Sequence, residues 1–257
     1  MKKNYFDLDG KVALITGASS GLGVQFAKAL GNQGAKLALV ARRKEKLENV
    51  KKELESLGYE IFIQQCDLSD FYSIPNVVEK IKEHYGTIDI LVNNAGIAYG
   101  TPAMDMPNEE WINIMNVNLN SVYILSREVG KLMKEKGKGG RIINLGSIHS
   151  TVAMKPFSLT SYATTKGGIL MLTKSLAAEW AKYGITVNAI GPSYFKSEMT
   201  DKLIDTPEFD QILKAYCPME RLGHPGELDG ALIYFASDAS TFTTGQLLQI
   251  DGGWTTI

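Results

Sequence analysis

Short, fully apolar runs alternate with longer amphipathic stretches along this 257-residue chain. A run without polar residues is typical of a strand buried on both faces of a parallel sheet, and an amphipathic stretch is typical of a helix that covers one. The runs are 12–15, 37–40, 61–63, 88–92, 142–145, 186–190 and 247–250. The stretches are 22–33, 44–57, 72–85, 109–136, 163–183 and 225–237. This alternation predicts an α/β fold, a three-layer, doubly wound parallel sheet with helices on both faces.

A single domain over residues 1–257 is expected. Hydrophobic residues make up 44% of the chain, enough for one core, and no repeat, low-complexity segment or linker interrupts it. The glycine- and lysine-rich segment 137–140 is interpreted as a helix-to-strand turn. The coil-rich segment 191–218 follows a strand end, and a long connection of this kind is often a functional lid. We therefore expect it to form a flap that covers the substrate.

The charge of the chain is nearly balanced, at net −1, without a basic stripe. This argues against nucleic acid or an anionic membrane surface as a partner. No apolar run is long enough to span a bilayer, and the first residues lack the apolar core of a secretory signal. Cys66 and Cys217 form no metal-binding or redox motif, so free, buried thiols in a cytoplasmic protein without a metal are expected.

A glycine-rich turn, TGASSGLG at 16–23, lies between the first predicted strand and the first predicted helix. Glycines permit a tight turn and a close approach of the backbone to a ligand, and the helix N-terminus offers free N–H groups to a pyrophosphate. The spacing differs from the usual GxGxxG, but the strand before it and the helix after it are the expected context. The predicted contacts are Gly17, Ser19, Ser20, Gly21, Leu22 and Gly23.

The end of the second predicted strand indicates which dinucleotide binds. An acidic residue there would bind the ribose 2′-hydroxyl of NAD, whereas an arginine would accommodate the 2′-phosphate of NADP. The chain has Arg42 and Arg43 at this point and no carboxylate. A guanidinium matches a phosphate in charge and geometry, which favours NADP over NAD. The alternative is that the two arginines only cap an exposed helix start.

Tyr162 and Lys166 are four residues apart in a predicted helix, so they share one face of it. A positive charge beside a phenol favours the phenolate, and we expect Lys166 to lower the pKa of Tyr162 so that the pair can transfer a proton. A single Tyr-x-x-x-Lys motif is more often an ordinary surface pair, so the interpretation depends on the rest of the chain.

Three features coincide: the glycine-rich turn, the sequence Asn93-Asn94-Ala95-Gly96 after the fourth predicted strand, and Ser147 upstream of the Tyr–Lys pair. Together they resemble the short-chain dehydrogenase/reductase family, from Leu8 to Trp254. The resemblance implies a Rossmann-type sheet and a hydride transfer between a nicotinamide and a carbinol carbon.

The resemblance also implies catalytic roles. Tyr162 would be the general acid/base, and Lys166 would lower its pKa and bind the nicotinamide ribose. Ser147 would steady the substrate oxygen, unless it is only a turn cap. Asn118 would hold a water in a proton relay, although two further asparagines, at 116 and 120, are its close neighbours.

Further residues would contact the cofactor in this family. Asp67 would bond the adenine amine, unless it only caps the following helix, and Ser197 would take the place of the threonine that bonds the carboxamide. The full set of contacts implied outside the glycine-rich turn and the arginines is Asp67, Leu68, Asn93, Asn94, Ala95, Gly96, Tyr162, Lys166, Pro192 and Ser197.

The chain departs from the family pattern at two places. Ser193 follows Gly191-Pro192 where a glycine is usual, so if that position needs a glycine conformation, Ser193 must bear strain or change the turn. The separation of Ser147 and Tyr162 is longer than in many members. The extra length lies in 150–160, which we expect to form one wall of the substrate pocket.

The segments 193–200 and 251–254 are most similar to the gluconate 5-dehydrogenase subgroup, which interconverts a hydroxyl and a ketone of a sugar acid. Lys155 or Lys196 could then meet a substrate carboxylate or could be solvated surface groups. The apolar residues expected near the pocket suit a steroid, a 3-oxoacyl thioester or an aromatic ketone equally well. The expected pocket residues are Tyr99, His149, Met154, Phe157, Tyr194, Phe195, Met199 and Trp254.

A reading of a different class is a dinucleotide-sensing regulator without turnover, but such a protein would be expected to lose Tyr162 or Lys166. Family members commonly form homotetramers through the helices that correspond to 109–136 and 163–183. The second of these carries more apolar residues than one buried face needs, which favours a homotetramer here.

Overall fold

A seven-stranded, fully parallel sheet forms the centre of the computed structural model, which describes residues 4–155, 157–198, 200–204 and 206–256. The strand order is β3-β2-β1-β4-β5-β6-β7, and every predicted apolar run lies in or beside a strand. The strands are β1 (Val12–Thr16), β2 (Lys36–Ala41), β3 (Ile61–Gln65), β4 (Ile90–Asn93), β5 (Gly140–Leu145), β6 (Ile185–Pro192) and β7 (Leu247–Ile250).

The strand order reverses between β1 and β4. The chain builds β1, β2 and β3 outward in one direction, then returns to place β4 on the other side of β1, where Ala13 pairs with both Leu37 and Ile90. In doubly wound sheets a ligand binds outside the carboxyl ends of the strands at such a switch point. The topology therefore fixes where a site is expected.

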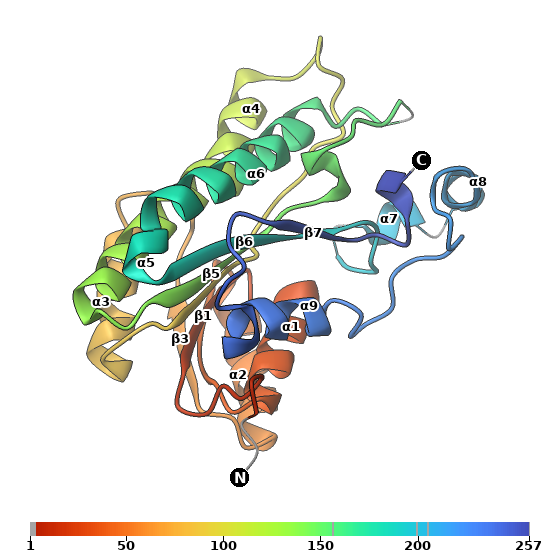
Figure 1. The fold of residues 1–257 in the computed structure, drawn as a ribbon. Coiled ribbons are helices and arrows are strands. Elements are labelled where there is room, and N and C mark those ends of the chain that lie inside the picture. Colours follow the sequence, from red (N-terminus) through yellow and green to blue (C-terminus); the bar gives the residue numbers. More distant parts are fainter. Residues whose placement is uncertain (1–3, 156, 199, 205, 257) are drawn as a thin grey trace.

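Helices cover both faces of the sheet (Figure 1). Helices α1 (Gly21–Asn32), α2 (Lys44–Ser56) and α9 (Asp229–Ala236) pack on one face. Helices α3 (Ile74–Tyr85), α5 (Ser121–Lys136) and α6 (Thr160–Trp180) pack on the other. Two separate clusters of buried apolar side chains result, one on each face, as the three-layer prediction requires.

The predicted helix 109–136 is divided in the structure. Helix α4 (Asn108–Met115) leads into a π-helical turn (Asn116–Asn120) and then into α5. Apolar periodicity continues through the turn, so the sequence pattern does not reveal it. The π turn matters because short π segments inside α-helices are frequent at functional sites. Helix α5 ends at Gly137 and β5 begins at Gly140, as expected for the turn at 137–140.

The segment 191–218 is less irregular than the sequence suggests. It contains α7 (Asp201–Ile204) and α8 (Pro207–Tyr216), and its first two residues complete β6. Helix α8 starts as capping rules predict: the Thr206 side chain accepts a hydrogen bond from the Phe209 N–H at 3.2 Å, and Pro207 follows the cap. Phe209 and Leu213 of α8 are buried in a third apolar cluster beside the sheet.

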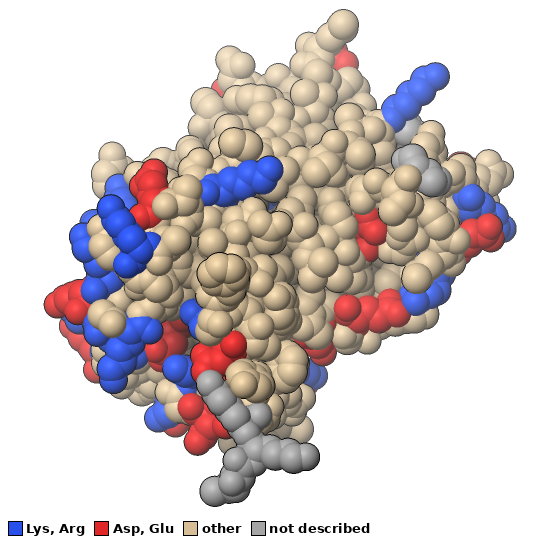
Figure 2. All heavy atoms as spheres, viewed as in Figure 1, with Lys and Arg blue, Asp and Glu red and all other residues tan. Residues whose placement is uncertain are grey.

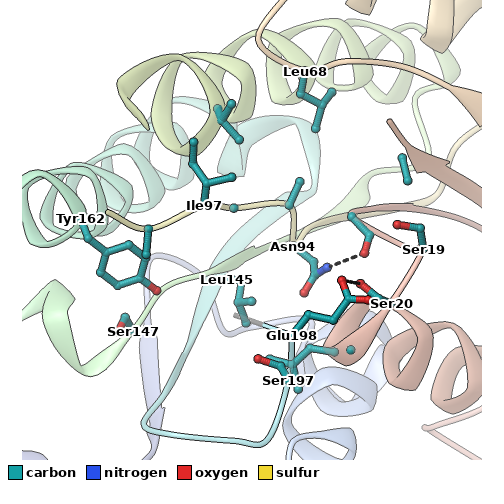
Figure 3. A pocket seen from close by; sticks show the side chains of 18 of the residues that line it. Ser19, Ser20, Leu68, Asn94, Ile97, Leu145, Ser147, Tyr162, Ser197 and Glu198 are labelled. Carbon is teal, nitrogen blue, oxygen red and sulfur yellow. Dashed lines mark hydrogen bonds between the residues drawn. The ribbon is translucent and has the colours of Figure 1, made fainter. Parts of the chain in front are cut away.

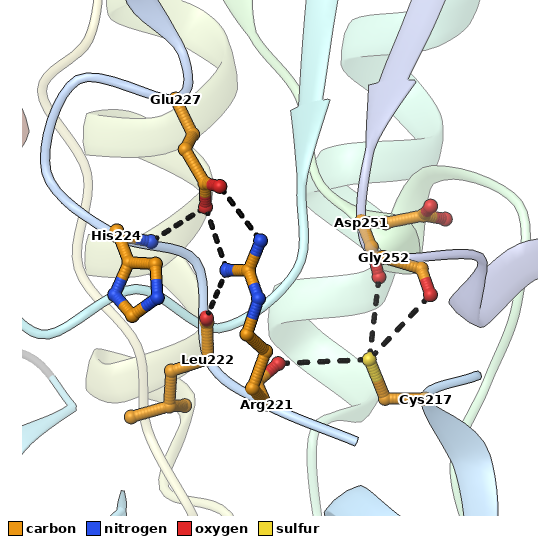
Figure 4. Close-up of polar contacts among 7 residues, drawn as sticks. All are labelled: Cys217, Arg221, Leu222, His224, Glu227, Asp251 and Gly252. Carbon is orange, nitrogen blue, oxygen red and sulfur yellow. Dashed lines mark hydrogen bonds and ion pairs between the residues drawn. The ribbon is translucent and has the colours of Figure 1, made fainter. Parts of the chain in front are cut away.

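Polar contacts tie the end of this segment to the C-terminal part of the chain (Figure 4). The Cys217 thiol lies 3.6–3.8 Å from the backbone oxygens of Arg221, Asp251 and Gly252. The guanidinium of Arg221 donates to both carboxylate oxygens of Glu227, at 2.9 and 2.7 Å. Cys217 is thus buried and unpaired with any other cysteine, as is Cys66.

Charged side chains of both signs are interspersed on the face shown in Figure 2, with broad uncharged areas between them. Within the described ranges, no helix has the length and apolar character that crossing a membrane would require. The same part of the chain holds no group of three or more histidine, cysteine, aspartate or glutamate side chains arranged to bind a metal ion.

Candidate active site

A cavity of about 580 Å³ opens at the carboxyl ends of the strands, around the switch point between β1 and β4. It brings together residues from the glycine-rich turn, the ends of β2, β4 and β5, helix α6 and the segment after β6 (Figure 3). The predicted residues that line it are Gly17, Ser19, Ser20, Gly21, Leu22, Arg42, Arg43, Asp67, Leu68, Asn94, Ala95, Gly96, Ser147, Tyr162, Lys166, Pro192 and Ser197.

Three predicted residues lie behind the lining. Gly23 packs against the Gly17 carbonyl within the turn. Asn118 is buried and contacts Thr165 of α6. Asn93 is buried in the core, where its side-chain amide donates to Ser126 at 3.0 Å and to Asn144 at 2.8 Å. Asn93 is therefore a structural residue, contrary to the expectation that it contacts the cofactor.

Close packing requires glycine in the turn that follows β1. Gly17 has a φ of +66°, and a side chain there would lie 2.9 Å from the Cα of Ala95. A Cβ at Gly23 would lie 2.3 Å from the Gly17 carbonyl oxygen. The Asn94 amide also donates to the Thr16 carbonyl at 2.8 Å, which fixes the turn against the end of β4. Helix α1 thus begins directly at the cavity, with its free N–H groups available to an anion.

The two arginines after β2 lie at one end of the cavity. Arg42 is 3.8 Å from a carboxylate oxygen of Asp67. Burial acts to raise the pKa of Asp67, but hydrogen bonds from Ser69 and the charge of Arg42 outweigh it and lower that pKa. Asp67 therefore caps the local turn at Ser69 and not the following helix, which begins at Ile74, and it also lines the cavity.

Ser147 and Tyr162 lie side by side at the other end, one just after β5 and the other in the first turn of α6 (Figure 3). The Lys166 ammonium is 5.5 Å from the centre of the Tyr162 ring and donates to the Leu145 carbonyl at 2.6 Å. Lys166 is only 4% exposed. The i, i+4 spacing in α6 thus places the pair on the face that closes the cavity.

The pKa values differ from the sequence expectation. Burial raises the pKa of Tyr162 to about 12, and the hydrogen bond with Ser147 only partly offsets this. Burial also lowers the pKa of Lys166 to about 8. The expected lowering of the tyrosine pKa is not seen in this structure, because burial sets the direction of the shift. The part that Lys166 plays in proton transfer stays a prediction. At neutral pH Tyr162 is protonated and can act as an acid.

Asn118 lies in the π-helical turn and is 1% exposed. Its side-chain oxygen accepts from the Ile97 N–H at 2.9 Å, and its amide donates to the Ile97 carbonyl at 2.8 Å and to Thr165 at 3.3 Å. It thereby connects the loop after β4 to α6, the helix that carries Tyr162 and Lys166. Asn116 and Asn120 bond to each other at 3.0 Å on the outer side, so of these three asparagines it is Asn118 that contacts the loop after β4.

Ser193 carries no backbone strain. Glu220 is the one non-glycine residue with a positive φ in the described part of the chain, and the Ser193 N–H donates to the Ile250 carbonyl at 3.4 Å. The pairing of β6 with β7 ends at Pro192, and Ser193 follows it without a positive φ, so this position does not need a glycine conformation.

The substrate side of the cavity is more polar than the sequence suggested. Tyr99 lines it as expected, and its hydroxyl accepts from Asn113, which also lines it, at 2.7 Å. Phe195 contributes an apolar surface. Several residues expected there pack into the third apolar cluster and do not line this cavity: Met154, Phe157, Tyr194 and Trp254. Tyr194 nevertheless lies near Tyr162, whose charge adds to burial in raising the pKa of Tyr194.

The structure also bears on the other pocket candidates, whose roles the sequence left open. Lys155 and Lys196 are exposed and do not line the cavity, and Met199 lies outside the described residues. His149 is buried beside the Tyr162 ring, with Nδ1 3.2 Å from the Val152 carbonyl, and burial lowers its pKa. The His149 ring therefore packs against the Tyr162 ring in an edge-to-face arrangement.

Glu198 is the main cavity residue that sequence reasoning missed. It follows Ser197, and its carboxylate bonds Arg43 at 2.8 Å and Ser20 at 3.2 Å. Its acidic charge beside a residue expected to contact the cofactor was the available signal, but the partner is 155 positions away in the chain.

The fold and this site define a short-chain dehydrogenase/reductase, and the chain belongs to that family. A family model described as "Enoyl-(Acyl carrier protein) reductase" matches residues 17–255. The chain is 36% identical over 252 residues to the gluconate 5-dehydrogenase of Gluconobacter oxydans (strain 621H), covering 98% of this chain and 97% of that relative.

Two further similarities point the same way. The 5-keto-D-gluconate 5-reductase of Escherichia coli (strain K12) is 37% identical over 250 residues, covering 97% of each chain. The crystal structure of a gluconate 5-dehydrogenase from Burkholderia cenocepacia J2315, in complex with NADP and tartrate, has a TM-score of 0.94 at 36% identity and covers 98% of each chain. Relatives that act on an alcohol or ketone thus match this chain from end to end.

Proposed function

We propose that this protein is an NADP(H)-dependent oxidoreductase that interconverts a secondary alcohol and a ketone on a sugar acid of the gluconate/5-ketogluconate type. One observation carries the proposal: Ser147, Tyr162 and Lys166 line the same cavity as the glycine-rich turn and the two arginines. A proton-transfer group and a dinucleotide cradle are therefore held in one space.

The residues present fit a dinucleotide. The glycine-rich turn would hold the pyrophosphate at the N-terminus of α1, because backbone N–H groups face the cavity and no side chain can enter at Gly17. Asp67 and Leu68 would hold the adenine, and Asn94 to Gly96, Pro192 and Ser197 would line the path to the nicotinamide. When bound, the cofactor supplies or accepts the hydride.

The arginines support NADP over NAD. Both line the cavity at the end of β2, where the 2′ position of the adenosine ribose is expected. Arg43 also has the hydroxyls of Ser19 and Ser20 within 3.3 and 2.8 Å, so a phosphate there would meet a cation and two hydroxyl groups. The Burkholderia relative with bound NADP agrees with this choice.

Each catalytic residue has a distinct task in the proposed reaction. In reduction, the Tyr162 hydroxyl gives its proton to the carbonyl oxygen as the hydride reaches the carbon, and in oxidation it takes the proton back. Ser147 hydrogen-bonds the same oxygen and orients it. Lys166 stabilises the tyrosinate that forms and binds the nicotinamide ribose. Asn118 fixes α6 against the loop after β4 and holds the start of a proton relay.

A polar substrate fits the walls better than an apolar one. Tyr99, Asn113, Ser147 and Ser193 line the cavity near Tyr162 with hydroxyl and amide groups. The argument for a steroid or a 3-oxoacyl thioester relied on apolar residues that pack instead into the cluster beneath α8. The relatives that act on gluconate or 5-ketogluconate support the sugar-acid class.

The proposal also includes the oligomeric state and the subcellular location of the protein. The outer faces of α5 and α6 carry exposed Tyr123 and Met171, which would be covered in a homotetramer paired through these helices. The segment from Ser193 to Pro218 would act as the flap over the substrate within one domain. A cytoplasmic location, without nucleic acid or membrane as a partner, agrees with the mixed surface charge.

Oxidation of NADPH with a panel of ketones, beside reduction of NADP with gluconate and other polyols, tests the function. We expect turnover with 5-ketogluconate and gluconate. Turnover of bulky apolar ketones alone would refute the substrate class. Binding of NADPH without turnover of any compound would favour the sensor reading, in which the site only reports the cofactor.

A further inference from the structure

The flap reaches across the mouth of the cavity through Glu198. One carboxylate oxygen accepts from the Arg43 guanidinium at 2.8 Å and from the Ser20 hydroxyl at 3.2 Å, and the other bonds the Lys46 ammonium. Figure 3 shows Glu198 directed from the flap toward Ser20 of the glycine-rich turn. Ser20 belongs to the glycine-rich turn, and Arg43 and Lys46 belong to the start of α2, so this contact joins the flap to two segments on either side of β2.

These partners form a set suited to an anion. Arg43 donates to Ser20 at 2.8 Å and to Ser19 at 3.3 Å, and Lys46 adds a second positive charge. The hydrogen bonds from Lys46 and Arg43 lower the pKa of Glu198 to about 2, so the carboxylate is ionised at neutral pH. Arg43 is also one of the two groups that the proposed function assigns to the 2′-phosphate of NADP.

A phosphate and the Glu198 carboxylate cannot share Arg43 at close range, because two anions a few ångströms apart repel each other. The carboxylate is the weaker competitor. Its side chain is 50% exposed, and exposed ion pairs hold little free energy. A phosphate has a larger charge and more acceptor oxygens.

We propose that the Glu198 carboxylate occupies the site of the cofactor's 2′-phosphate and competes with it for Arg43, which makes Glu198 a residue that sets the balance between NADP and NAD. The inference rests on the proposed function. NADP must displace Glu198 to reach Arg43, and it therefore binds less tightly than the arginine alone would allow. NAD has no 2′-phosphate and leaves the contact in place.

The contact also supplies the carboxylate that is absent from the end of β2. An acidic side chain at that strand end ordinarily accepts the 2′-hydroxyl of NAD. Here the strand continues into two arginines, but the flap brings a carboxylate to the second of them. Glu198 can therefore serve as an acceptor for a ribose hydroxyl when no phosphate is present, which extends the use of the site to NAD.

Two nucleotides isolate the effect of the phosphate: adenosine 2′,5′-bisphosphate and adenosine 5′-monophosphate, which differ only at the 2′ position. Calorimetric titration of the wild type and of Glu198→Gln measures both. We expect Glu198→Gln to bind the bisphosphate about tenfold more tightly, because one competing charge-assisted contact is removed. Its affinity for the monophosphate should stay the same or fall.

Two further variants sharpen the test. Asp210→Asn removes another exposed carboxylate of the flap, the one paired with Lys214, and should leave both affinities unchanged. In an Arg43→Met background, Glu198→Gln should no longer favour the bisphosphate, because the competition is for that guanidinium.

An equal change for both nucleotides, or weaker bisphosphate binding by Glu198→Gln, would overturn the inference while leaving the proposed function intact. A wild type that binds the bisphosphate no better than the monophosphate would instead refute the 2′-phosphate site itself. The ratio of kcat/KM for NADP over NAD provides the second readout, and it should rise about tenfold in Glu198→Gln.

Discussion

Replacement of Lys166 with methionine should change how the stability of the protein depends on pH. Lys166 is buried beneath the cavity, and its burial lowers its pKa from 10.5 to about 8. The unfolded chain therefore holds a proton on this group over a range of pH in which the folded protein has released it. In that range the free energy of unfolding rises with pH.

The magnitude follows from the two pKa values. Each unit of difference corresponds to about 1.4 kcal/mol. Between about pH 7 and about pH 9.5, deprotonation of Lys166 in the folded protein should raise the free energy of unfolding of the wild type by about 2 kcal/mol, and Lys166→Met should lack this rise. Tyr162, whose pKa is raised to about 12, stays protonated in the folded protein over this range. The small opposing slope that arises as the tyrosine of the unfolded chain begins to ionise is the same in both proteins and cancels in their difference.

Urea unfolding monitored by tryptophan fluorescence at several pH values gives the free energy of unfolding for each variant. Lys174→Met is the matched control, because it removes an exposed ammonium from the same helix. The free energy of unfolding of the wild type minus that of Lys166→Met should increase as the pH rises. The same difference taken for Lys174→Met should stay constant. If the value for Lys166→Met stays constant or decreases with pH, the conclusion that desolvation dominates at this lysine is refuted.

Three other substitutions test the parts of the site separately. Gly23→Ala should weaken NADPH binding and destabilise the protein by about 1–3 kcal/mol, because its Cβ would lie 2.3 Å from the Gly17 oxygen. Gly167→Ala is the control: its Cβ would meet no atom within 4 Å, so it should change neither property. Asn118→Ala should lower the free energy of unfolding by about 2 kcal/mol by leaving Ile97 unpaired, and unchanged urea unfolding would contradict this. Arg42→Asp should shift the kcat/KM ratio toward NAD, and an unchanged ratio would exclude Arg42 from the phosphate site.

Local sequence patterns were sufficient for the sheet and the cofactor cradle. The apolar run at 12–15 followed by the glycine-rich turn predicts a strand, a tight turn and a helix N-terminus, and each of these depends only on neighbouring residues. The same holds for Tyr162 and Lys166, because their i, i+4 spacing in a helix fixes a common face. The sequence predicts such features because their geometry depends only on residues that are close together in the chain.

Features that depend on distant contacts could not be predicted in this way. The pKa of Tyr162 is raised by burial, which the i, i+4 spacing to Lys166 does not reveal. Tyr194 and Trp254 were placed in the pocket by their position near the flap, but they pack against α8, a helix that the sequence interpretation did not expect. The partners of Glu198 come from the glycine-rich turn and the start of α2, at least 152 positions away, and no local pattern links them.

Substitution of Tyr162 with phenylalanine tests the central claim most directly. It removes the hydroxyl that exchanges the proton and keeps the ring, so NADPH binding should be nearly unchanged. The rate of NADPH-dependent reduction of 5-ketogluconate should fall about 10²–10⁴-fold, the usual contribution of a positioned general acid. Turnover close to that of the wild type would contradict the assignment of Tyr162 as the proton donor and with it the proposed mechanism.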